Sequence, residues 1–226
     1  MPEIADRLNT LRQALAEAAR LAGRAPESVH LVAVSKTAPV TSIREAYDAG
    51  QRVFGENRAQ ELLSKVGELP PDCRWHLIGH LQGNKAKVAV EHAALVHSVD
   101  SLALLQRLDR LAGEAGRRLP ILLQVNLAGE ASKSGCTPAE LDALSEAATA
   151  APHLDWQGLM TIGPLVATEP ELHRLFAGLR EHRDRLASSL GRPLPELSMG
   201  MSGDYRIAIA EGATLVRIGS AIFGGR

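Results

Sequence analysis

The chain has 226 residues, of which 45% are hydrophobic, 23% are charged and only 3% are aromatic, and its formal net charge is −1. This composition supports a large buried core and excludes a disordered or fibrous chain. A balanced charge gives no attraction to nucleic acid or anionic lipid, and few rings are available to stack on bases. We therefore expect neither nucleic acid nor a membrane as a partner.

The first residues do not read as a targeting signal. Glu3 and Asp6 make this stretch acidic, where a signal peptide is basic, and no apolar run reaches the roughly 18 to 20 residues needed to cross a bilayer. Cys73 and Cys136 lack the spacing of metal ligands or of a redox pair. We expect a cytoplasmic protein with two free thiols.

Helix-length segments alternate with short apolar runs along the chain. An amphipathic helix is predicted first, at 2–21, and Gly23 is placed to end it. The run at 29–35 is continuously apolar and β-branched, as in a parallel strand covered on both faces. Further strands are predicted at 52–54, 75–78, 95–99, 120–127, 155–160, 197–198 and 214–218. Further helices are predicted at 41–49, 56–66, 84–92, 101–115, 138–150, 169–190 and 204–210.

This alternation predicts an α/β fold, a single (β/α)8 TIM-like barrel with an extra N-terminal helix. A doubly wound open sheet is the alternative. There is no linker of low complexity, so residues 1–226 are expected to form one domain. Barrel proteins carry their sites where strands end, and residues that follow the apolar runs are therefore the candidates.

Lys36 directly follows the first predicted strand. The chain has five lysines among its 25 basic residues, so a lysine at this place is informative. Partly desolvated surroundings would lower its pKa and leave a neutral amine able to attack a carbonyl. The alternative is a lysine whose head group reaches solvent.

Small residues follow the last two predicted strands. They permit close approach of the backbone, and their N–H and hydroxyl groups could hold a phosphate at the position usual in barrels. The candidates are the stretches at 198–204 and 216–225, with the hydroxyls of Ser202 and Ser220. Ordinary turns are the alternative. Arg217, a charge within an apolar strand, needs either a ligand or a carboxylate if it is buried.

Two other strand ends carry polar side chains. Glu56 and Asn57 could bond a ligand, but capping of the next helix is favoured on sequence alone. His76 and His80 have no third ligand at a convincing spacing, so no metal site is predicted.

Seven stretches of the chain, taken in order, carry a resemblance to a known family. They are LVAVSKT (31–37), FGEN (54–57), HLIGHLQGNK (76–85), SKSG (132–135), GLM (158–160), SMGMS (198–202) and VRIGSAIFG (216–224). Together they resemble the pyridoxal 5′-phosphate homeostasis proteins, also called YggS or PROSC proteins. The order and extent of these stretches make the resemblance specific, whereas any one of them would not be.

The resemblance implies a barrel like the N-terminal domain of alanine racemase, with pyridoxal 5′-phosphate (PLP) as cofactor and its aldehyde joined to Lys36 as a Schiff base. The residues it implies for the rest of the cofactor are Met201, Ser202, Gly219 and Ser220 near the phosphate, Arg217 toward the pyridine nitrogen and Asn57 beside the ring. An arginine there discourages protonation of the pyridine and weakens the ring as an electron sink. Two positions depart from the family pattern, Ala38 and Arg58.

The function implied is that of a carrier. A monomer is expected separately, because no second domain is predicted to cover the barrel mouth. The chain would hold PLP on Lys36 and take part in intracellular PLP homeostasis and delivery to apo-enzymes, with little or no catalysis. The alternative is a PLP-dependent amino-acid racemase, which needs a second acid/base opposite the lysine, and Tyr205 is the candidate because Tyr47 is expected to pack within a helix. A third interpretation is a barrel enzyme acting on another phosphorylated metabolite through Lys36.

Overall fold

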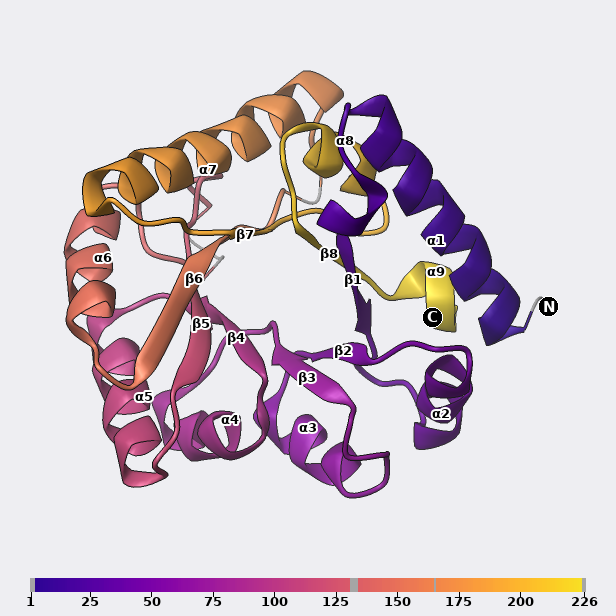
Figure 1. Cartoon of the computed structure of the whole chain (residues 1–226), viewed down its shortest axis with the longest axis horizontal. Coiled ribbons are helices and arrows are strands. Elements are labelled where there is room, and N and C mark those ends of the chain that lie inside the picture. Colours follow the sequence, from indigo (N-terminus) through magenta and orange to yellow (C-terminus); the bar gives the residue numbers. More distant parts are fainter. Residues whose placement is uncertain (1–2, 131–133, 165, 225–226) are drawn as a thin grey trace.

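The computed structural model describes residues 3–130, 134–164 and 166–224. Its strands close into a parallel barrel in sequence order, β1 to β8, and β8 pairs with β1 (Figure 1). The strands are β1 (His30–Val34), β2 (Val53–Glu56), β3 (Arg74–Leu77), β4 (Leu95–Val99), β5 (Leu119–Gln124), β6 (Leu154–Met160), β7 (Glu196–Ser198) and β8 (Leu215–Ile218). The predicted barrel is confirmed, and the alternative of an open sheet is wrong.

Helices form a ring around the barrel (Figure 1). The α-helices are α1 (Ile4–Leu21), α2 (Val40–Asp48), α3 (Ala59–Val66), α4 (Ala86–His92), α5 (Leu102–Glu114), α6 (Leu141–Ala150), α7 (Glu169–Leu190), α8 (Tyr205–Ala210) and α9 (Ser220–Phe223). Two 3₁₀ turns, η1 (Pro26–Ser28) and η2 (Gly83–Lys85), precede β1 and α4.

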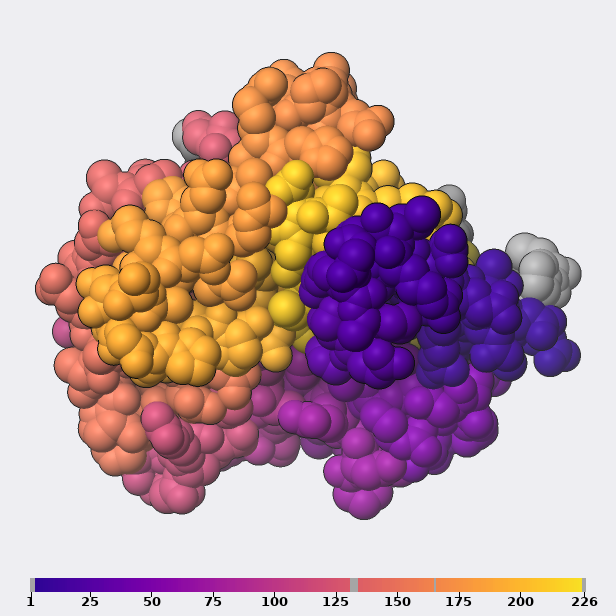
Figure 2. Space-filling model, turned by 45° about the horizontal axis from the view of Figure 1, so that its top comes forward, coloured from indigo at the N-terminus to yellow at the C-terminus, as the bar shows by residue number. Residues whose placement is uncertain are grey.

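Helix α1 is the predicted extra N-terminal helix. Its buried side chains recur at helical spacing and include Leu8, Leu11 and Leu15. The helix contacts α8 and α9, so the beginning and the end of the chain pack together. Figure 2 shows this contact, with α1 in indigo against the yellow C-terminal part.

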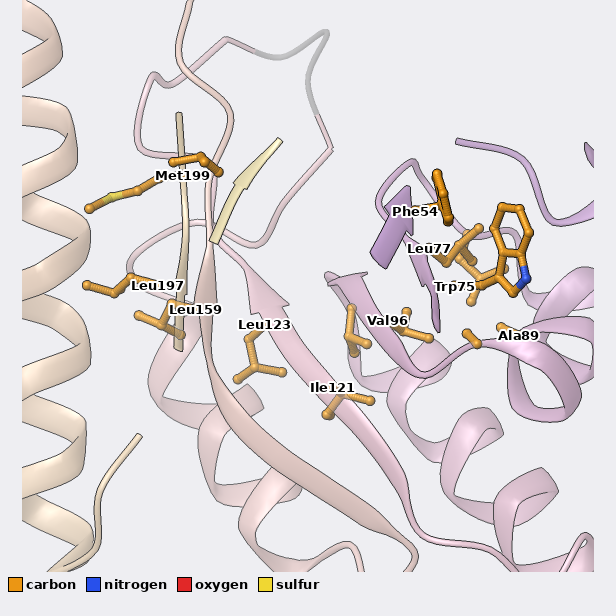
Figure 3. Packing of buried hydrophobic residues seen from close by; sticks show 14 of the residues in the cluster. Phe54, Trp75, Leu77, Ala89, Val96, Ile121, Leu123, Leu159, Leu197 and Met199 are labelled. Atoms are coloured by element: carbon orange, nitrogen blue, oxygen red, sulfur yellow. The ribbon is translucent and has the colours of Figure 1, made fainter. Parts of the chain in front are cut away.

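Each face of the barrel wall is covered by an apolar layer, so the strands are buried on both faces. Inside the barrel, one cluster consists of Val32, Ile78, Leu95, Leu122, Met160 and Leu215. Between strands and helices lies the larger layer, of which Figure 3 shows Phe54, Trp75 and their neighbours. Neighbouring positions such as Val32 and Ala33 enter different layers, which explains why the strands read as continuous apolar runs.

Element boundaries differ from the prediction at one place that matters for function. Strand β2 was expected to end at 54, with Glu56 opening a helix, but Glu56 is the last residue of β2 and pairs with Leu77. Helix α3 has Arg58 as its N-cap, without a side-chain capping bond. The predicted capping role of Glu56 and Asn57 is therefore wrong. Helix α9 was not predicted.

Two further observations bear on the sequence expectations. Within the described ranges, no helix is both long enough and apolar enough to cross a membrane. Cys73 and Cys136 are buried free thiols, as predicted. Residues 132–133 of the SKSG stretch lie outside the described residues.

Candidate functional site

A cavity of about 900 Å³ opens near the carboxyl ends of the strands. Residues on or after β1, β2, β3, β6, β7 and β8 line it. They include every predicted site residue: Lys36, Asn57, Met201, Ser202, Arg217, Gly219 and Ser220. Parallel strands of a barrel all finish at one end, so residues far apart in sequence converge there.

Lys36 lines the cavity two residues after β1, and its side chain is exposed. The expectation that it lies in partly desolvated surroundings is therefore wrong for this structure. The reason is that the chain turns at once after Ser35, which is fully buried, and carries Lys36 away from the strand layer. The amine is thus accessible from the cavity.

Two hydroxyl groups meet where the loops after β7 and β8 approach each other. Ser220 Oγ donates to Ser202 Oγ at 3.0 Å, and both serines line the cavity. A Cβ at Gly219 would lie 2.8 Å from the Val34 carbonyl oxygen, so a glycine is required for this loop to lie against the end of β1. The N–H of Met201 already donates to Asp204 Oδ1 at 2.6 Å. The hydroxyls are therefore better placed than the Met201 amide to bind an anion.

Arg217 lies on β8 and is only 5% exposed. Its guanidinium donates to Ser198 Oγ at 2.6 Å and to the Thr161 carbonyl oxygen at 2.8 Å. Burial lowers the pKa of Arg217 to about 10, with Asp204 opposing the shift. It still carries a positive charge at neutral pH, and within the described chain it makes no ion pair.

A chain of buried side chains continues from Arg217 through Ser198 to two histidines. Ser198 Oγ lies 2.8 Å from His97 Nδ1, and His97 Nε2 lies 3.0 Å from His76 Nδ1. The Ser198 hydroxyl accepts from Arg217, and the tautomer of His97 sets the direction of its bonds to Ser198 and to His76. Burial lowers the pKa of His76 to about 3, with Arg74 adding to the effect. Burial, His76 and Arg217 also lower the pKa of His97, so both rings are neutral.

Asn57 follows β2 and is half-buried at the cavity wall. A Cβ at Gly79 would lie 2.3 Å from the Asn57 carbonyl oxygen. The loop after β3 can therefore support Asn57 closely because residue 79 has no side chain. This close contact fixes the backbone position of Asn57, from which its side chain extends.

The chain matches a family model described as the alanine racemase N-terminal domain over residues 7–226. A pyridoxal phosphate homeostasis protein of Pseudomonas aeruginosa is 48% identical, over 100% of this chain and 97% of that protein. A protein of the same name from Escherichia coli is 42% identical, over 100% and 98% of the two chains. The chain belongs to the pyridoxal phosphate homeostasis protein family.

Solved structures agree with this membership. PipY of Synechococcus elongatus, a structure described as having PLP bound, is 47% identical, with a TM-score of 0.84 over 98% of this chain and 100% of that one. Alanine racemase from Streptomyces coelicolor is 23% identical, with a TM-score of 0.73 over 98% of this chain and 59% of that one. The racemase shares the barrel fold, and the homeostasis protein family accounts for the whole length of this chain.

Neither tyrosine of this family member lines the cavity, although both lie in the described part of the chain. Tyr205 packs against the hydrophobic core, and Tyr47 donates to Asp72 Oδ1 at 2.6 Å. The side chain that the racemase interpretation needs opposite Lys36 is therefore not supplied by Tyr205 in this structure. Of the two departures from the family pattern, Ala38 is buried at the cavity wall and Arg58 is exposed.

Sequence reasoning missed two kinds of buried polar residue. Lys65 is buried on α3 beside Glu56, and its only sequence signal is its position three residues after the buried Leu62. His97 lies inside a strand whose every residue is buried. The sequence signal for it is a histidine within an otherwise apolar run.

His76 and His80, which were considered as a possible metal pair, have different partners in the structure. His76 bonds His97, whereas His80 lines the cavity with its Nδ1 3.3 Å from Asp100 Oδ2. Within the described ranges, no three His, Cys, Asp or Glu side chains are grouped so as to hold a metal ion.

Proposed function

We propose that the chain binds pyridoxal 5′-phosphate in the cavity that contains Lys36. In this role it serves in PLP homeostasis, holding the cofactor and delivering it to apo-enzymes with little or no catalysis. The observation that carries the proposal is the convergence of an accessible lysine, a buried arginine and two serine hydroxyls on one cavity of about 900 Å³. Its support from relatives is the PLP-bound structure described for PipY, which is 47% identical.

The donor set of the cavity fits a phosphorylated pyridine aldehyde. The Ser202 and Ser220 hydroxyls can donate to phosphate oxygens, and their mutual hydrogen bond keeps them together. Hydrogen bonds to Ser198 and Thr161 hold the Arg217 guanidinium in place. It can therefore donate to a ring nitrogen without moving. Asn57 adds an amide at the wall.

When bound, PLP supplies an aldehyde that condenses with a primary amine. Lys36 provides that amine, and in the condensation the C=O bond is replaced by a C=N bond while one water leaves. The neutral histidines behind Arg217 offer no proton to pass toward the ring, and Arg217 itself stays a donor. This arrangement keeps the ring nitrogen unprotonated, which supports a carrier role over catalysis through the ring.

We further propose that residues 1–226 act as one domain and as a monomer. The domain proposal is supported by the contacts of α1 with α8 and α9, which join the two ends of the chain. The monomer proposal is supported by the large exposed hydrophobic residues of the described chain, because each lies on a different element: Leu21 on α1, Leu63 on α3, Leu102 on α5 and Val166 before α7. Light scattering of the purified chain, with and without PLP, measures the mass directly.

Reductive trapping tests the central proposal. The protein is incubated with PLP and treated with borohydride, which adds hydride across the C=N bond and locks the adduct, and peptides are then mapped by mass spectrometry. The adduct is expected on Lys36, to be absent in Lys36→Ala, and to be unchanged in Lys87→Ala, whose side chain is 74% exposed on α4. An adduct spread over surface lysines in the wild type would contradict the proposal.

A further inference from the structure

Two buried side chains, Lys65 and Glu56, and the partly buried Glu61 form a cluster beside the turn that carries Lys36. Lys65 Nζ lies 2.8 Å from Glu56 Oε1 and 2.7 Å from Glu61 Oε1. The side chains of Lys65, Glu56 and Glu61 are 7%, 0% and 23% exposed. We call these three residues the Lys65 cluster. Such a cluster is costly to bury unless its hydrogen bonds are well made.

The Lys65 cluster bonds to the chain on both sides of Lys36. Before Lys36, Lys65 Nζ donates to the Ser35 carbonyl oxygen at 2.9 Å, and Ser35 Oγ donates to Glu56 Oε1 at 2.6 Å. After Lys36, the N–H of Thr37 donates to Glu61 Oε1 at 2.5 Å. The flanks of the lysine are therefore tied to the same three side chains.

Lys36 is a central residue of a tight turn. The Ser35 carbonyl oxygen accepts from the Ala38 N–H at 2.9 Å, so Lys36 and Thr37 occupy the two middle positions. Thr37 has φ 62°, and it is the one non-glycine residue with positive φ in the described chain. A β-branched residue is unfavourable in this region, so the conformation needs support from outside the turn. The bond from Thr37 to Glu61 supplies it.

The carboxyl pKa shifts in the Lys65 cluster agree with a role as a fixed support for the turn. Burial raises the pKa of Glu56, against the effect of its bonds from Lys65 and Ser35. Burial also opposes ionisation of Glu61, but the hydrogen bonds from Lys65 and Thr37 outweigh it and lower its pKa. The Glu61 carboxylate is thus stabilised in the charged form that accepts both bonds.

We propose that the three residues of the Lys65 cluster are positioning residues. They hold the turn at residues 35–38, with Thr37 in the left-handed region, and so present the Lys36 amine to the cavity. The inference rests on the proposed binding of PLP through Lys36. It assigns no contact with the cofactor to Glu56, Glu61 or Lys65. Their effect is on the rate at which the lysine reaches the aldehyde, because misplacement of a reacting group slows bond formation without removing the rest of the binding site.

The experiment separates the covalent step from binding of the rest of the cofactor. Apo-protein is mixed with PLP, samples are reduced with borohydride at intervals, and the Lys36 adduct is quantified by mass spectrometry. Affinity for pyridoxine 5′-phosphate, which has the ring and phosphate but no aldehyde, is measured by calorimetry. Glu61→Ala removes the acceptor for Thr37, and Glu61→Gln keeps an oxygen there. Glu91→Ala is the matched control, because Glu91 pairs with Lys87 at the same helical spacing on the surface.

Glu61→Ala is expected to form the adduct at least about tenfold more slowly, with affinity for pyridoxine 5′-phosphate little changed. Glu61→Gln is expected to recover most of the rate, and Glu91→Ala to match the wild type. A wild-type rate in Glu61→Ala, or a parallel loss of affinity for the analogue, would overturn the inference. Should Glu61→Ala not fold, the pair Lys65→Met with Glu56→Gln gives the same test. A wild-type protein without a Lys36 adduct would instead sink the proposed function.

Discussion

Two buried cations near the candidate site are treated differently by their surroundings. Lys65 is paired with two carboxylates, Glu56 and Glu61, within 2.8 Å. Arg217 is bonded to a hydroxyl and a carbonyl oxygen, and a pair of neutral histidines lies behind it. The first cation is neutralised by direct ion pairs, whereas the second forms no ion pair in the described chain and is influenced by Asp204 only through a longer-range interaction.

The difference indicates what each region does. A buried charge is costly unless it is paired, and the pairing of Lys65 leaves it with the single task of holding the chain around Lys36. Arg217 is retained in the barrel without a carboxylate, so its charge and donors remain available to a ligand in the cavity. Substitutions in the two regions, and a change of pH, should therefore have different consequences for stability and for ligand binding.

Removal of the Lys65 ammonium should cost the most stability. Lys65→Met leaves the fully buried Glu56 carboxyl without its cation, and we expect a loss of about 3–5 kcal/mol in the free energy of unfolding, measured in urea. Adding Glu56→Gln, which removes the orphaned charge, should restore most of it. A loss of less than about 1 kcal/mol in Lys65→Met would show that the ion pair does not support the fold.

Acid should act first on the histidine pair. The pKa of His76 is lowered to about 3 from its ordinary 6.5, so the unfolded chain takes up the proton first and stability falls as pH drops through this window. Each such histidine contributes a slope of about 1.4 kcal/mol per pH unit. Between pH 6.5 and 4.5 the lowered carboxyl pKa of Glu61 adds little, because its ordinary value is 4.5, and the raised carboxyl pKa of Glu56 acts in the opposite sense to the histidines.

His76→Asn should flatten this slope, measured as the free energy of unfolding at a series of pH values. The same pH dependence in the variant and the wild type would mean that His76 does not stay neutral in the fold. The result would weaken the view that the surroundings of Arg217 offer no proton.

Loss of the Arg217 charge should weaken ligand binding more than stability. Arg217→Gln keeps a donor toward Ser198 but removes the cation, and we expect the affinity for pyridoxine 5′-phosphate to fall by about 1.5–3 kcal/mol, measured by calorimetry. An unchanged affinity would show that the Arg217 charge does not face the ligand.

The serine pair should give the smallest effect. Ser202→Ala and Ser220→Ala are each expected to cost about 0.5–1.5 kcal/mol of PLP affinity, with binding of pyridoxal, which lacks the phosphate, unaffected. The two changes should not add, because the hydroxyls bond each other. Equal losses for PLP and pyridoxal would place the phosphate elsewhere.

The barrel was predictable because its strands are covered on both faces. Runs such as 31–34 and 121–123 alternate between an inner and an outer apolar layer, and this leaves continuous hydrophobic stretches in the sequence. Glu56 was misassigned because a carboxylate at a strand end resembles a helix cap until its buried partner, Lys65, is known. That partner lies on the next helix, and sequence spacing does not reveal which face of α3 it occupies.

The candidate cavity was predictable residue by residue because barrel strands deliver their ends to one place. The resemblance to a family supplied Met201 and the role of each residue, including Asn57. Position in the sequence alone left these roles open. The environment of each residue was not predictable. Lys36 was expected to be partly desolvated and is exposed, since that depends on the turn geometry set by Glu61 and Lys65. His97 was overlooked because its partners, Ser198 and His76, come from other strands.

A crystal structure of the chain grown with PLP would show whether the cofactor is bound to Lys36. The account predicts continuous electron density between Lys36 Nζ and the aldehyde carbon, with phosphate oxygens within hydrogen-bonding distance of the Ser202 and Ser220 hydroxyls. Density for the cofactor away from this cavity, or a Lys36 side chain that points into bulk solvent while PLP is bound, would contradict it.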